Sequence, residues 1–336
     1  MDDGAPGGRR RVAIACQGGG SHTAFTAGAL QGLLRRFPGE LELAALTGTS
    51  GGAICAALAW DGLVRGNIPQ AFDKLQRFWN EVAATDPLDQ LVNHALMATM
   101  GLRDLMVLPE VTPYQFPPWG EDRFRAILEG YFDFEELRLL ARAPGAPVLR
   151  IGAVEVLSGH FELFGGEELS VECLLASAAI PELFRAVTVP GRGVYWDGLF
   201  SQNPPIDDLI DRQIDELWIV QINSSTCPGI PTETHEIIDR RNALSGNLSM
   251  EQELGFIERL NRGLASGKID STKYRPMKVS RISLDRELGY RSKLDRRYEF
   301  LNELREFGNT KARWFLRERE AALGVAPRPR EERVAT

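Results

Sequence analysis

Two glycine-rich turns, each between an apolar run and a helical pattern, constrain the fold of this chain more than any other feature. The run "RRVAIAC" leads into three glycines, after which apolar residues recur at helical spacing. The run "LELAAL" leads into "TGTSGG", and an alanine-rich helical segment begins there. Repeated strand–turn–helix units are typical of a parallel sheet covered by helices. We therefore expect an α/β protein.

The rest of the 336-residue sequence predicts one domain. We see no internal repeat and no low-complexity linker that would separate two units. The expected parts are a disordered arm (1–9), a single domain (10–323) with a core at about 12–225, a lid-like insertion at about 67–145 and a C-terminal helical extension at about 232–323, and a disordered tail (324–336).

Local patterns give further expectations within this domain. Segment 111–124 is rich in proline and aromatic residues, so we expect an irregular loop there. A long helical segment at 234–267 contains Gly246, which is a candidate break. Short apolar runs predict more strands at 147–156, 159–165, 192–200, 216–224 and 277–284.

The charge and the cysteines exclude some classes of protein. The formal net charge is −7 at pH 7, whereas nucleic-acid binders usually present a basic face, so we expect no nucleic-acid partner. Four cysteines are scattered without paired spacing, which indicates reduced thiols. The first apolar run is too short for a signal peptide, and no run has the length of a membrane span. We expect a cytoplasmic protein that can act peripherally at a membrane surface.

The second glycine-rich turn contains a candidate nucleophile. Ser50 stands in Gly48-Thr49-Ser50-Gly51-Gly52, a G-x-S-x-G pattern. Small neighbours are needed where a tight turn lifts a serine hydroxyl above a sheet. Amides at the start of the following helix favour a developing oxyanion. The alternative is a serine that only caps the helix, but the strand before it and the helix after it favour the nucleophile.

The first glycine-rich turn is a candidate anion site. Gly18, Gly19 and Gly20 allow successive amides to turn toward one point, which suits an oxyanion hole. A dinucleotide-binding loop would use the same geometry, but Thr23 stands where that pattern needs its third glycine. A purely structural tight turn is the remaining alternative.

A base for the serine is the third requirement. Asp197 in "YWDGLF" can accept a proton directly from a hydroxyl held against it, although a lone Asp-Gly is more often only a turn. A Ser–Asp–His triad in that chain order would need His235, which lies at the polar start of a helix. No histidine has a convincing setting for a general base. The sequence has no HExxH and no paired Cys/His spacing, so we expect no metal and no cofactor.

Taken together, these stretches resemble the patatin-like phospholipase family. Its motifs are G-G-G-x-[R/K]-G, G-x-S-x-G and D-G-[G/A], and they stand here in order as "GGGSHT", "GTSGG" and "DGL". A fourth family-like block is "LLASAAIPELFRAV", before the aspartate. The resemblance covers about 12–203, and the wording near the C-terminus is similar to a bacterial subgroup with its own helical extension.

The resemblance implies a patatin-like three-layer sandwich, with a mostly parallel central sheet flanked by helices. It implies a carboxylic ester hydrolase with a Ser–Asp dyad, in which Ser50 attacks a lipid ester, Asp197 is the base, and an acyl-enzyme forms. The oxyanion would be held by amides of Gly18, Gly19, Gly20 and Gly51. The loop departs from the family pattern at its last two positions, His22 and Thr23, and Leu199 replaces a small residue after Asp197-Gly198.

Two alternatives stay open. One is an α/β-hydrolase-type esterase with a triad of Ser50, Asp197 and His235, and the other is a catalytically inactive lipid-binding protein. A lipid substrate requires access at an interface, and we expect part of segment 101–120 to line or cover the acyl site. The sequence does not indicate the natural lipid or the oligomeric state. The apolar and aromatic residues of that segment are Leu105, Met106, Val107, Leu108, Tyr114, Phe116 and Trp119.

Overall fold

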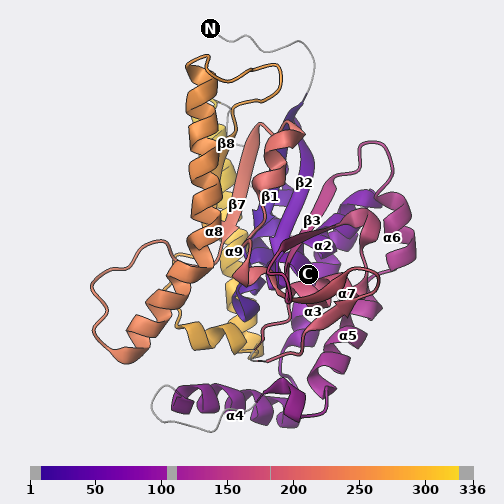
Figure 1. Cartoon of the computed structure of the whole chain (residues 1–336), viewed down its shortest axis with the longest axis vertical. Helices are drawn as coiled ribbons and strands as arrows, with labels where there is room; N and C mark the ends of the chain where they lie inside the picture. The colour runs from indigo at the N-terminus through magenta and orange to yellow at the C-terminus, as the bar shows by residue number, and fades with distance from the viewer. Residues whose placement is uncertain (1–8, 104–111, 182, 325–336) are drawn as a thin grey trace, which may run out of the picture.

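The structure is a computed structural model that describes residues 9–103, 112–181 and 183–324. Its centre is an eight-stranded sheet with the strand order β5-β6-β3-β2-β1-β7-β8, and β4 pairs with β3 outside this path (Figure 1). The strands are β1 (Arg10–Cys16), β2 (Leu41–Thr49), β3 (Val148–Glu155), β4 (Phe161–Gly165), β5 (Val187–Val189), β6 (Gly193–Asp197), β7 (Glu216–Gln221) and β8 (Lys278–Ser283).

The register of the sheet brings the three motifs to neighbouring positions. Strands β3, β2, β1, β7 and β8 are parallel, so β1 and β2 end at the same edge. Cys16 pairs with Gly48 and Thr49 pairs with Gly152, which sets the two glycine-rich turns side by side. Strand β6 runs antiparallel to β3 and ends at Asp197, opposite Ala153. Residues far apart in the chain therefore meet at one edge.

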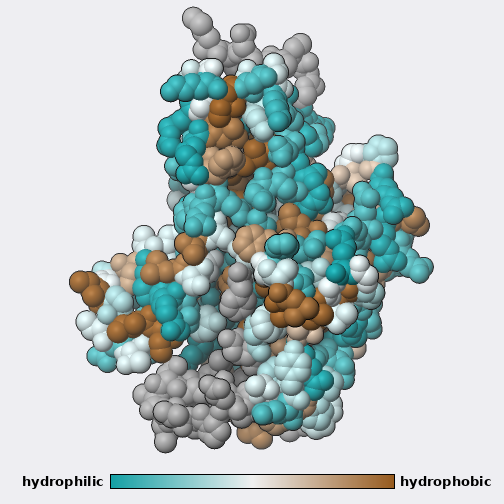
Figure 2. Space-filling model, viewed as in Figure 1, coloured by the Kyte–Doolittle hydropathy of each residue, from teal (hydrophilic) through white to brown (hydrophobic). Residues whose placement is uncertain are grey.

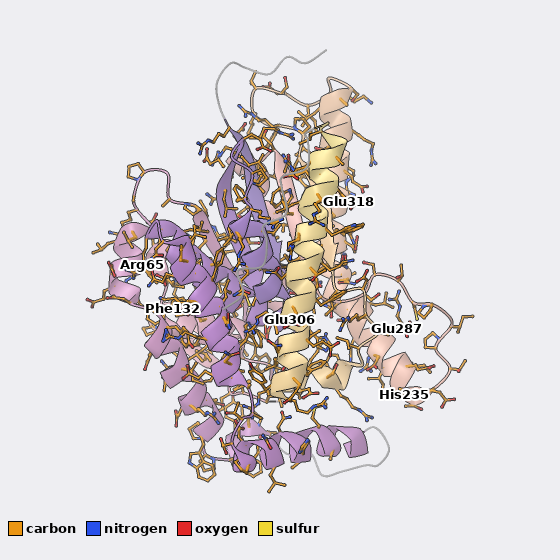
Figure 3. All side chains as sticks on the ribbon, turned by 180° about the vertical axis from the view of Figure 1, so that it is seen from behind. Arg65, Phe132, His235, Glu287, Glu306 and Glu318 are labelled. Atoms are coloured by element: carbon orange, nitrogen blue, oxygen red, sulfur yellow. The ribbon has the colours of Figure 1, made fainter. Side chains whose placement is uncertain are left out.

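Helices cover both faces of the sheet. One face is packed by α1 (Ala24–Arg35), α2 (Gly51–Val64), α3 (Ile68–Val82) and α9 (Tyr298–Ala322), whose apolar side chains form the larger buried cluster. The second cluster lies on the other face, under α8 (Thr234–Ala265). Figure 3, drawn from behind, shows α9 running along the sheet. This arrangement of helix, sheet and helix layers confirms the predicted fold class.

The predicted insertion is more helical than its sequence indicated. It contains α3, α4 (Pro87–Arg103), α5 (Trp119–Tyr131) and α6 (Phe134–Leu140), with only a short 3₁₀ turn at Pro113–Gln115. The expectation of an irregular loop through residue 124 is wrong, because α5 begins at Trp119 and carries acidic residues in its first turn, where they favour a helix start. Leu105, Met106, Val107 and Leu108 lie outside the described residues.

The helix after β7 has no break. α8 is continuous from Thr234 to Ala265, so the candidate break at Gly246 is wrong. A Cβ at Gly246 would lie 2.7 Å from Asn223 Nδ2, so this glycine allows a close approach rather than a kink. The remaining helical elements include α7 (Val171–Ser177), η4 (Gly198–Phe200) and η6 (Tyr290–Leu294). Within the described segments, no helix is both long and apolar enough to cross a bilayer.

Candidate active site

Ser50 sits on a strained turn between β2 and α2. Its φ of 56° and ψ of −133° are rare for a residue with a side chain. The turn is possible because Gly48 and Gly52 leave room: a Cβ at Gly48 would lie 2.7 Å from Ala53 N, and one at Gly52 would lie 2.4 Å from Cys16 O. Within the described chain, the Ser50 hydroxyl makes no capping hydrogen bond to α2, which argues against the purely capping interpretation.

Two hydrogen bonds hold this turn from behind. The Ser50 amide donates to Ser177 Oγ over 2.9 Å, and Ser177 Oγ donates in turn to Gly152 O over 2.7 Å. Ser177 lies at the end of α7 and is fully buried. It belongs to the fourth family-like block, "LLASAAIPELFRAV", so this block supports the turn that carries the serine.

Asp197 is fully buried at the end of β6 and its two carboxylate oxygens have different surroundings. Oδ1 accepts a hydrogen bond from Leu199 N over 2.7 Å, which is the local turn expected of an Asp-Gly pair. Oδ2 has no well-formed hydrogen bond to any described residue. The turn after Asp197 lies against the strand end that carries Ser50, because a Cβ at Gly198 would lie 3.0 Å from Thr49 Cγ2.

Burial dominates the acidity of Asp197. Loss of hydration raises the pKa of this carboxyl to about 7, against smaller lowering effects of Leu199 N, the Ser50 hydroxyl and the charge of Lys293. A carboxylate with a pKa near neutrality is a far better proton acceptor than an ordinary exposed aspartate. The structure therefore brings a strained serine and a basic carboxylate together.

The glycine-rich loop after β1 lies against the serine. A Cβ at Gly18 would be 2.9 Å from Ser50 Cβ, so only glycine permits this approach. The amides of Gly19, Gly20 and Gly51 make no hydrogen bond to any residue that the structure describes. Gly18 differs, because its amide donates to Asn203 Oδ1 over 2.6 Å and is not available to an oxyanion in this structure.

Buried amide side chains that the sequence analysis did not single out hold this loop. Gln17 Oε1 accepts from the amides of Ile222 and Asn223, both over 2.8 Å, and its Nε2 donates to Asn247 Oδ1 over 2.8 Å. Asn203 clamps Gly18 and also donates to the α8 backbone. The position of Gln17 beside the three glycines is the one local signal that pointed to this network.

The two departures at the end of the loop have structural partners. His22 is buried, and its Nε2 lies 2.7 Å from Ser292 Oγ. Burial lowers the pKa of His22 to about 3, helped by the charge of Lys293, so the ring is neutral. Thr23 Oγ1 donates to Gly20 O over 2.6 Å and fills the space that a Cβ at Gly51 would need. Gly51 therefore makes room for Thr23.

His235, the histidine of the alternative triad, is exposed in the first turn of α8. Figure 3 shows it at the N-terminal end of α8, away from the central sheet. In the described part of the chain, no hydrogen bond connects it to Asp197. His94 and His160 are exposed as well.

The sequence model of the patatin-like phospholipases matches residues 14–210, more than half of the chain, and this span contains both glycine-rich turns and Asp197. The chain belongs to the patatin-like phospholipase family. No curated protein sequence is significantly similar to it. Membership in this family supports a lipid hydrolase. It also confirms the resemblance seen in the motifs.

Two solved structures similar to this patatin-like chain come from bacterial proteins. VipD from Legionella pneumophila is 13% identical with a TM-score of 0.37, over 89% of this chain and 67% of VipD. ExoU in the ExoU–SpcU complex of the type III secretion system of Pseudomonas aeruginosa is 16% identical with a TM-score of 0.34, over 92% of this chain. This chain spans 51% of that ExoU chain, so about half its length.

A cavity of about 930 Å³ opens beside the glycine-rich loop of this patatin-like protein. His22, Asn223 and Lys293 line it, together with Asp239 and Arg240 of α8. The connection between β7 and α8 and the first turns of α8 also line the cavity, and we call these residues the α8 arm. Figure 2 shows apolar surface on this arm, where Ile230 and two α8 residues, Ile237 and Leu244, are exposed.

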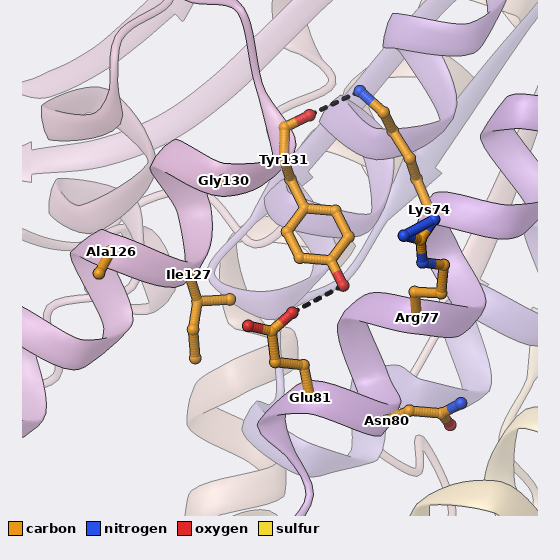
Figure 4. Close-up of a pocket in the computed structure, with 8 residues that line it drawn as sticks. All are labelled: Lys74, Arg77, Asn80, Glu81, Ala126, Ile127, Gly130 and Tyr131. Atoms are coloured by element: carbon orange, nitrogen blue, oxygen red, sulfur yellow. Dashed lines mark hydrogen bonds between the residues drawn. The ribbon is translucent and has the colours of Figure 1, made fainter.

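A second cavity, of about 590 Å³, lies away from the motifs between α3 and α5 (Figure 4). Its charged groups have partners: Tyr131 donates to Glu81 Oε2 over 3.0 Å, and Lys74 contacts Asp61 and the Tyr131 carbonyl. Among the described residues that line it, none is a serine, threonine or cysteine. Among the residues with described positions, no cluster of three or more histidine, cysteine or acidic side chains forms a metal site.

Proposed function

We propose that this protein is a serine acyl hydrolase that cleaves carboxylic esters of lipids. Ser50 is its nucleophile and Asp197 its base. The observation that carries the proposal is the meeting, at one sheet edge, of a strained serine, a fully buried carboxylate and backbone amides that have no hydrogen-bond partner among the described residues. Family membership supports the lipid as substrate.

The reaction proceeds in two halves. Ser50 Oγ attacks the ester carbonyl and its proton passes to Asp197 Oδ2. The amides of Gly19, Gly20 and Gly51 stabilise the negative oxygen of the tetrahedral intermediate. The intermediate collapses, the alcohol leaves with the proton from Asp197, and an acyl-Ser50 remains. Water then gives a proton to Asp197 as its oxygen attacks the acyl carbonyl. The second tetrahedral intermediate collapses, the fatty acid leaves, and Asp197 returns the proton to Ser50 Oγ.

A dyad is supported over a triad by the surroundings of Asp197. One carboxylate oxygen accepts from Leu199 N and the Ser50 hydroxyl lowers the pKa of the carboxyl, whereas His235 is exposed in the first turn of α8. An inactive lipid-binding protein is disfavoured because the strained turn at Ser50 would then cost free energy without purpose.

We propose that segment 112–121 borders the substrate entrance and contacts a lipid surface. Phe116 and Trp119 are 58% and 76% exposed. Arg185 fixes the segment, donating to the carbonyl oxygens of Pro113 and Phe116. A small cavity of about 190 Å³ lies next to this segment and reaches Ala179. The carbonyl oxygen of Ala179 accepts a hydrogen bond from the amide of Asp197. Exposed aromatic side chains near a lipase site suit a membrane interface.

A panel of substrates tests the proposed function. Wild type, Ser50→Ala, Asp197→Asn and His235→Ala would be assayed on a phospholipid, a glyceride and a short aryl ester, and labelled with a fluorophosphonate. We expect labelling and hydrolysis in wild type, none in Ser50→Ala, and a rate lower by about 10²–10⁴-fold in Asp197→Asn. His235→Ala should resemble wild type.

Three results would contradict the proposal. A wild type that neither labels nor hydrolyses any of the esters would favour the inactive lipid-binding protein. Full activity in Ser50→Ala would exclude the nucleophile. Loss of activity in a folded His235→Ala variant would favour the triad.

A further inference from the structure

Two adjacent residues in the middle of α8, Gly246 and Asn247, contact the glycine-rich loop from outside the family-matched residues 14–210. Asn247 Oδ1 accepts a hydrogen bond from Gln17 Nε2 over 2.8 Å, and Gly246 O accepts from the same nitrogen over 3.2 Å. A Cβ at Gly246 would lie 2.7 Å from Asn223 Nδ2, so the glycine lets the helix come this close. The middle of α8 therefore packs directly against the residue that begins the loop.

The Asn247 side chain also holds the end of β7. Its Nδ2 donates to Asn223 O over 3.3 Å and to Ser224 O over 3.2 Å. Asparagine is a poor helix former, and a buried amide costs free energy unless it is hydrogen-bonded. Asn247 is 5% exposed, and its bonds to the loop and to the end of β7 offset this cost. The residue thus joins α8 to the segments that follow two paired strands, β1 and β7.

Gln17 connects Asn247 to the amides of the loop. It is fully buried, and its Oε1 accepts from the amides of Ile222 and Asn223, both over 2.8 Å. Ile222 packs against the loop in turn, because a Cβ at Gly19 would lie 2.5 Å from Ile222 Cγ2. Each step from Asn247 through Gln17 to the loop is therefore a direct contact between buried groups.

The amides of Gly19 and Gly20 have no hydrogen-bond partner among the described residues, so their direction depends on how the loop is held. We propose that Asn247 is a positioning residue, which fixes through Gln17 the direction in which these two amides point. This inference rests on the proposed function of the amides as oxyanion donors. Donors of this kind must be aimed at the developing charge before the reaction begins. A displacement of about 1 Å can cost about 10²-fold in rate.

An NMR measurement tests the inference without relying on turnover. Glycine labelled with ¹³C at the carbonyl and ¹⁵N at the amide gives an HNCO spectrum that selects amides preceded by another glycine, among them Gly19 and Gly20. We expect Asn247→Leu to move or broaden both signals. The signal of Gly166, which packs against Trp60, is the internal reference and should not move.

Asn247→Leu is expected to fold, because leucine is similar in size to asparagine and Gly246 O still accepts from Gln17. If it does not fold, Asn247→Ser, which leaves room for a water molecule, takes its place in the same measurements.

The kinetic readout is the separation of kcat from KM on a short aryl ester. Asn247→Leu should lower kcat by about 10–100-fold and change KM by less than about threefold, because the loop acts on the transition state. Asn247→Asp keeps the shape and an acceptor oxygen for Gln17, so it should recover most of the lost rate. Asn261→Leu is the matched control: Asn261 on the same helix donates to Met277 O over 2.8 Å and accepts from Met277 N over 2.9 Å. Its loss should lower stability and leave kcat unchanged.

Unmoved Gly19 and Gly20 signals in Asn247→Leu, or an unchanged kcat, overturn the inference. An equal fall of kcat in Asn261→Leu overturns it as well, since a general loss of stability would then explain both variants. A folded Asn247→Asp that stays as slow as Asn247→Leu excludes the route through Gln17. Moved signals in a protein whose wild type neither labels with a fluorophosphonate nor hydrolyses esters would support the hold of Asn247 on the loop and contradict the proposed function alone.

Discussion

Ser50 occupies a backbone region that glycine enters without penalty and other residues enter only under strain. Ser50→Gly should therefore relieve strain, whereas Ser50→Ala should keep it. We expect both variants to be inactive, with the glycine variant more stable than the alanine variant by about 1–2 kcal/mol. Urea unfolding of the two variants at one pH measures the difference. Equal stabilities would show that the turn is not strained at this residue.

The pKa of Asp197 predicts a pH-dependent stability. Its folded value, about 7, lies above the ordinary value of 3.8, so the folded state binds more protons than the unfolded state between these limits. The stability that this group contributes is present at low pH and is lost as the pH rises through 7. Asp197→Asn removes the titration. The variant should gain stability over wild type between pH 4 and pH 8, by at most about 4 kcal/mol.

Denaturant unfolding at pH 5 and pH 8 is the measurement for this prediction, and Asp239→Asn is a control carboxyl in the same region. A constant difference between Asp197→Asn and wild type at both pH values would contradict the raised pKa of Asp197.

Short motifs predicted the residues whose roles depend on local backbone geometry. Ser50 and its glycines were found because a tight strand-to-helix turn needs small residues at fixed spacing. Asn203, Asn223 and Asn247 were not found, since nothing in their own segments marks them. Each acquires its role from a partner on another element, as Asn247 does from Gln17, and such contacts are set by the fold.

At the scale of elements, the backbones of α1 and α9 approach each other closely. A Cβ at Gly28 would lie 1.8 Å from Arg305 O, and one at Gly308 would lie 2.0 Å from Phe25 O. Two backbones can approach this closely only where side chains are absent. The predicted helical extension is thus packed against the first helix of the core.

Alanine at these glycines should therefore destabilise the protein. We expect Gly28→Ala and Gly308→Ala each to lower the free energy of unfolding by about 2 kcal/mol or more, because backbone atoms would have to move. Gly130→Ala is the matched control: this glycine lies on α5 with no neighbouring atom within 4 Å of the place a Cβ would take, and alanine should add about 0.5–1 kcal/mol. Thermal unfolding compares the three, and a tolerated Gly28→Ala would contradict the close packing.

Periodicity predicted the helices that have one apolar stripe and failed where other signals competed. α3 was found because its buried residues recur at helical spacing. The start of α5 was missed because prolines and aromatic residues precede it, although Leu128 is buried as in an ordinary packed helix. Gly246 was taken as a candidate break, whereas its purpose is contact with Asn223.

At the scale of the whole molecule, the sequence predicted the sheet and its layers but not what connects the two ends of the chain. Arg319 near the end of α9 pairs with Glu216 on β7 over 3.0 Å, both side chains being almost completely buried. The same guanidinium bonds Glu40, ahead of β2. No sequence pattern marks Arg319 as buried, because it is one of many charged residues on a helix rich in alternating charges. Its pairs with Glu216 and Glu40 therefore could not be predicted.

The exposed aromatic residues of segment 112–121 lead to a prediction for the molecule at a lipid surface. Phe116→Ser with Trp119→Ser removes apolar surface that a bilayer would cover, so vesicle binding and hydrolysis of vesicle lipids should fall about tenfold or more. Hydrolysis of a short, monomeric aryl ester should remain near wild type, because Ser50 and Asp197 are untouched. Vesicle sedimentation and the two assays measure these effects.

Trp314→Ser is the matched control for this pair of substitutions. Trp314 is 54% exposed on α9, the helix that covers the face of the sheet seen in Figure 3. Its loss should leave vesicle binding intact if the interface is confined to segment 112–121. Equal losses in the control and the double variant would indicate non-specific adsorption, and equal losses on vesicles and monomeric ester would indicate damage to the active site. Either result would exclude this segment as the membrane contact.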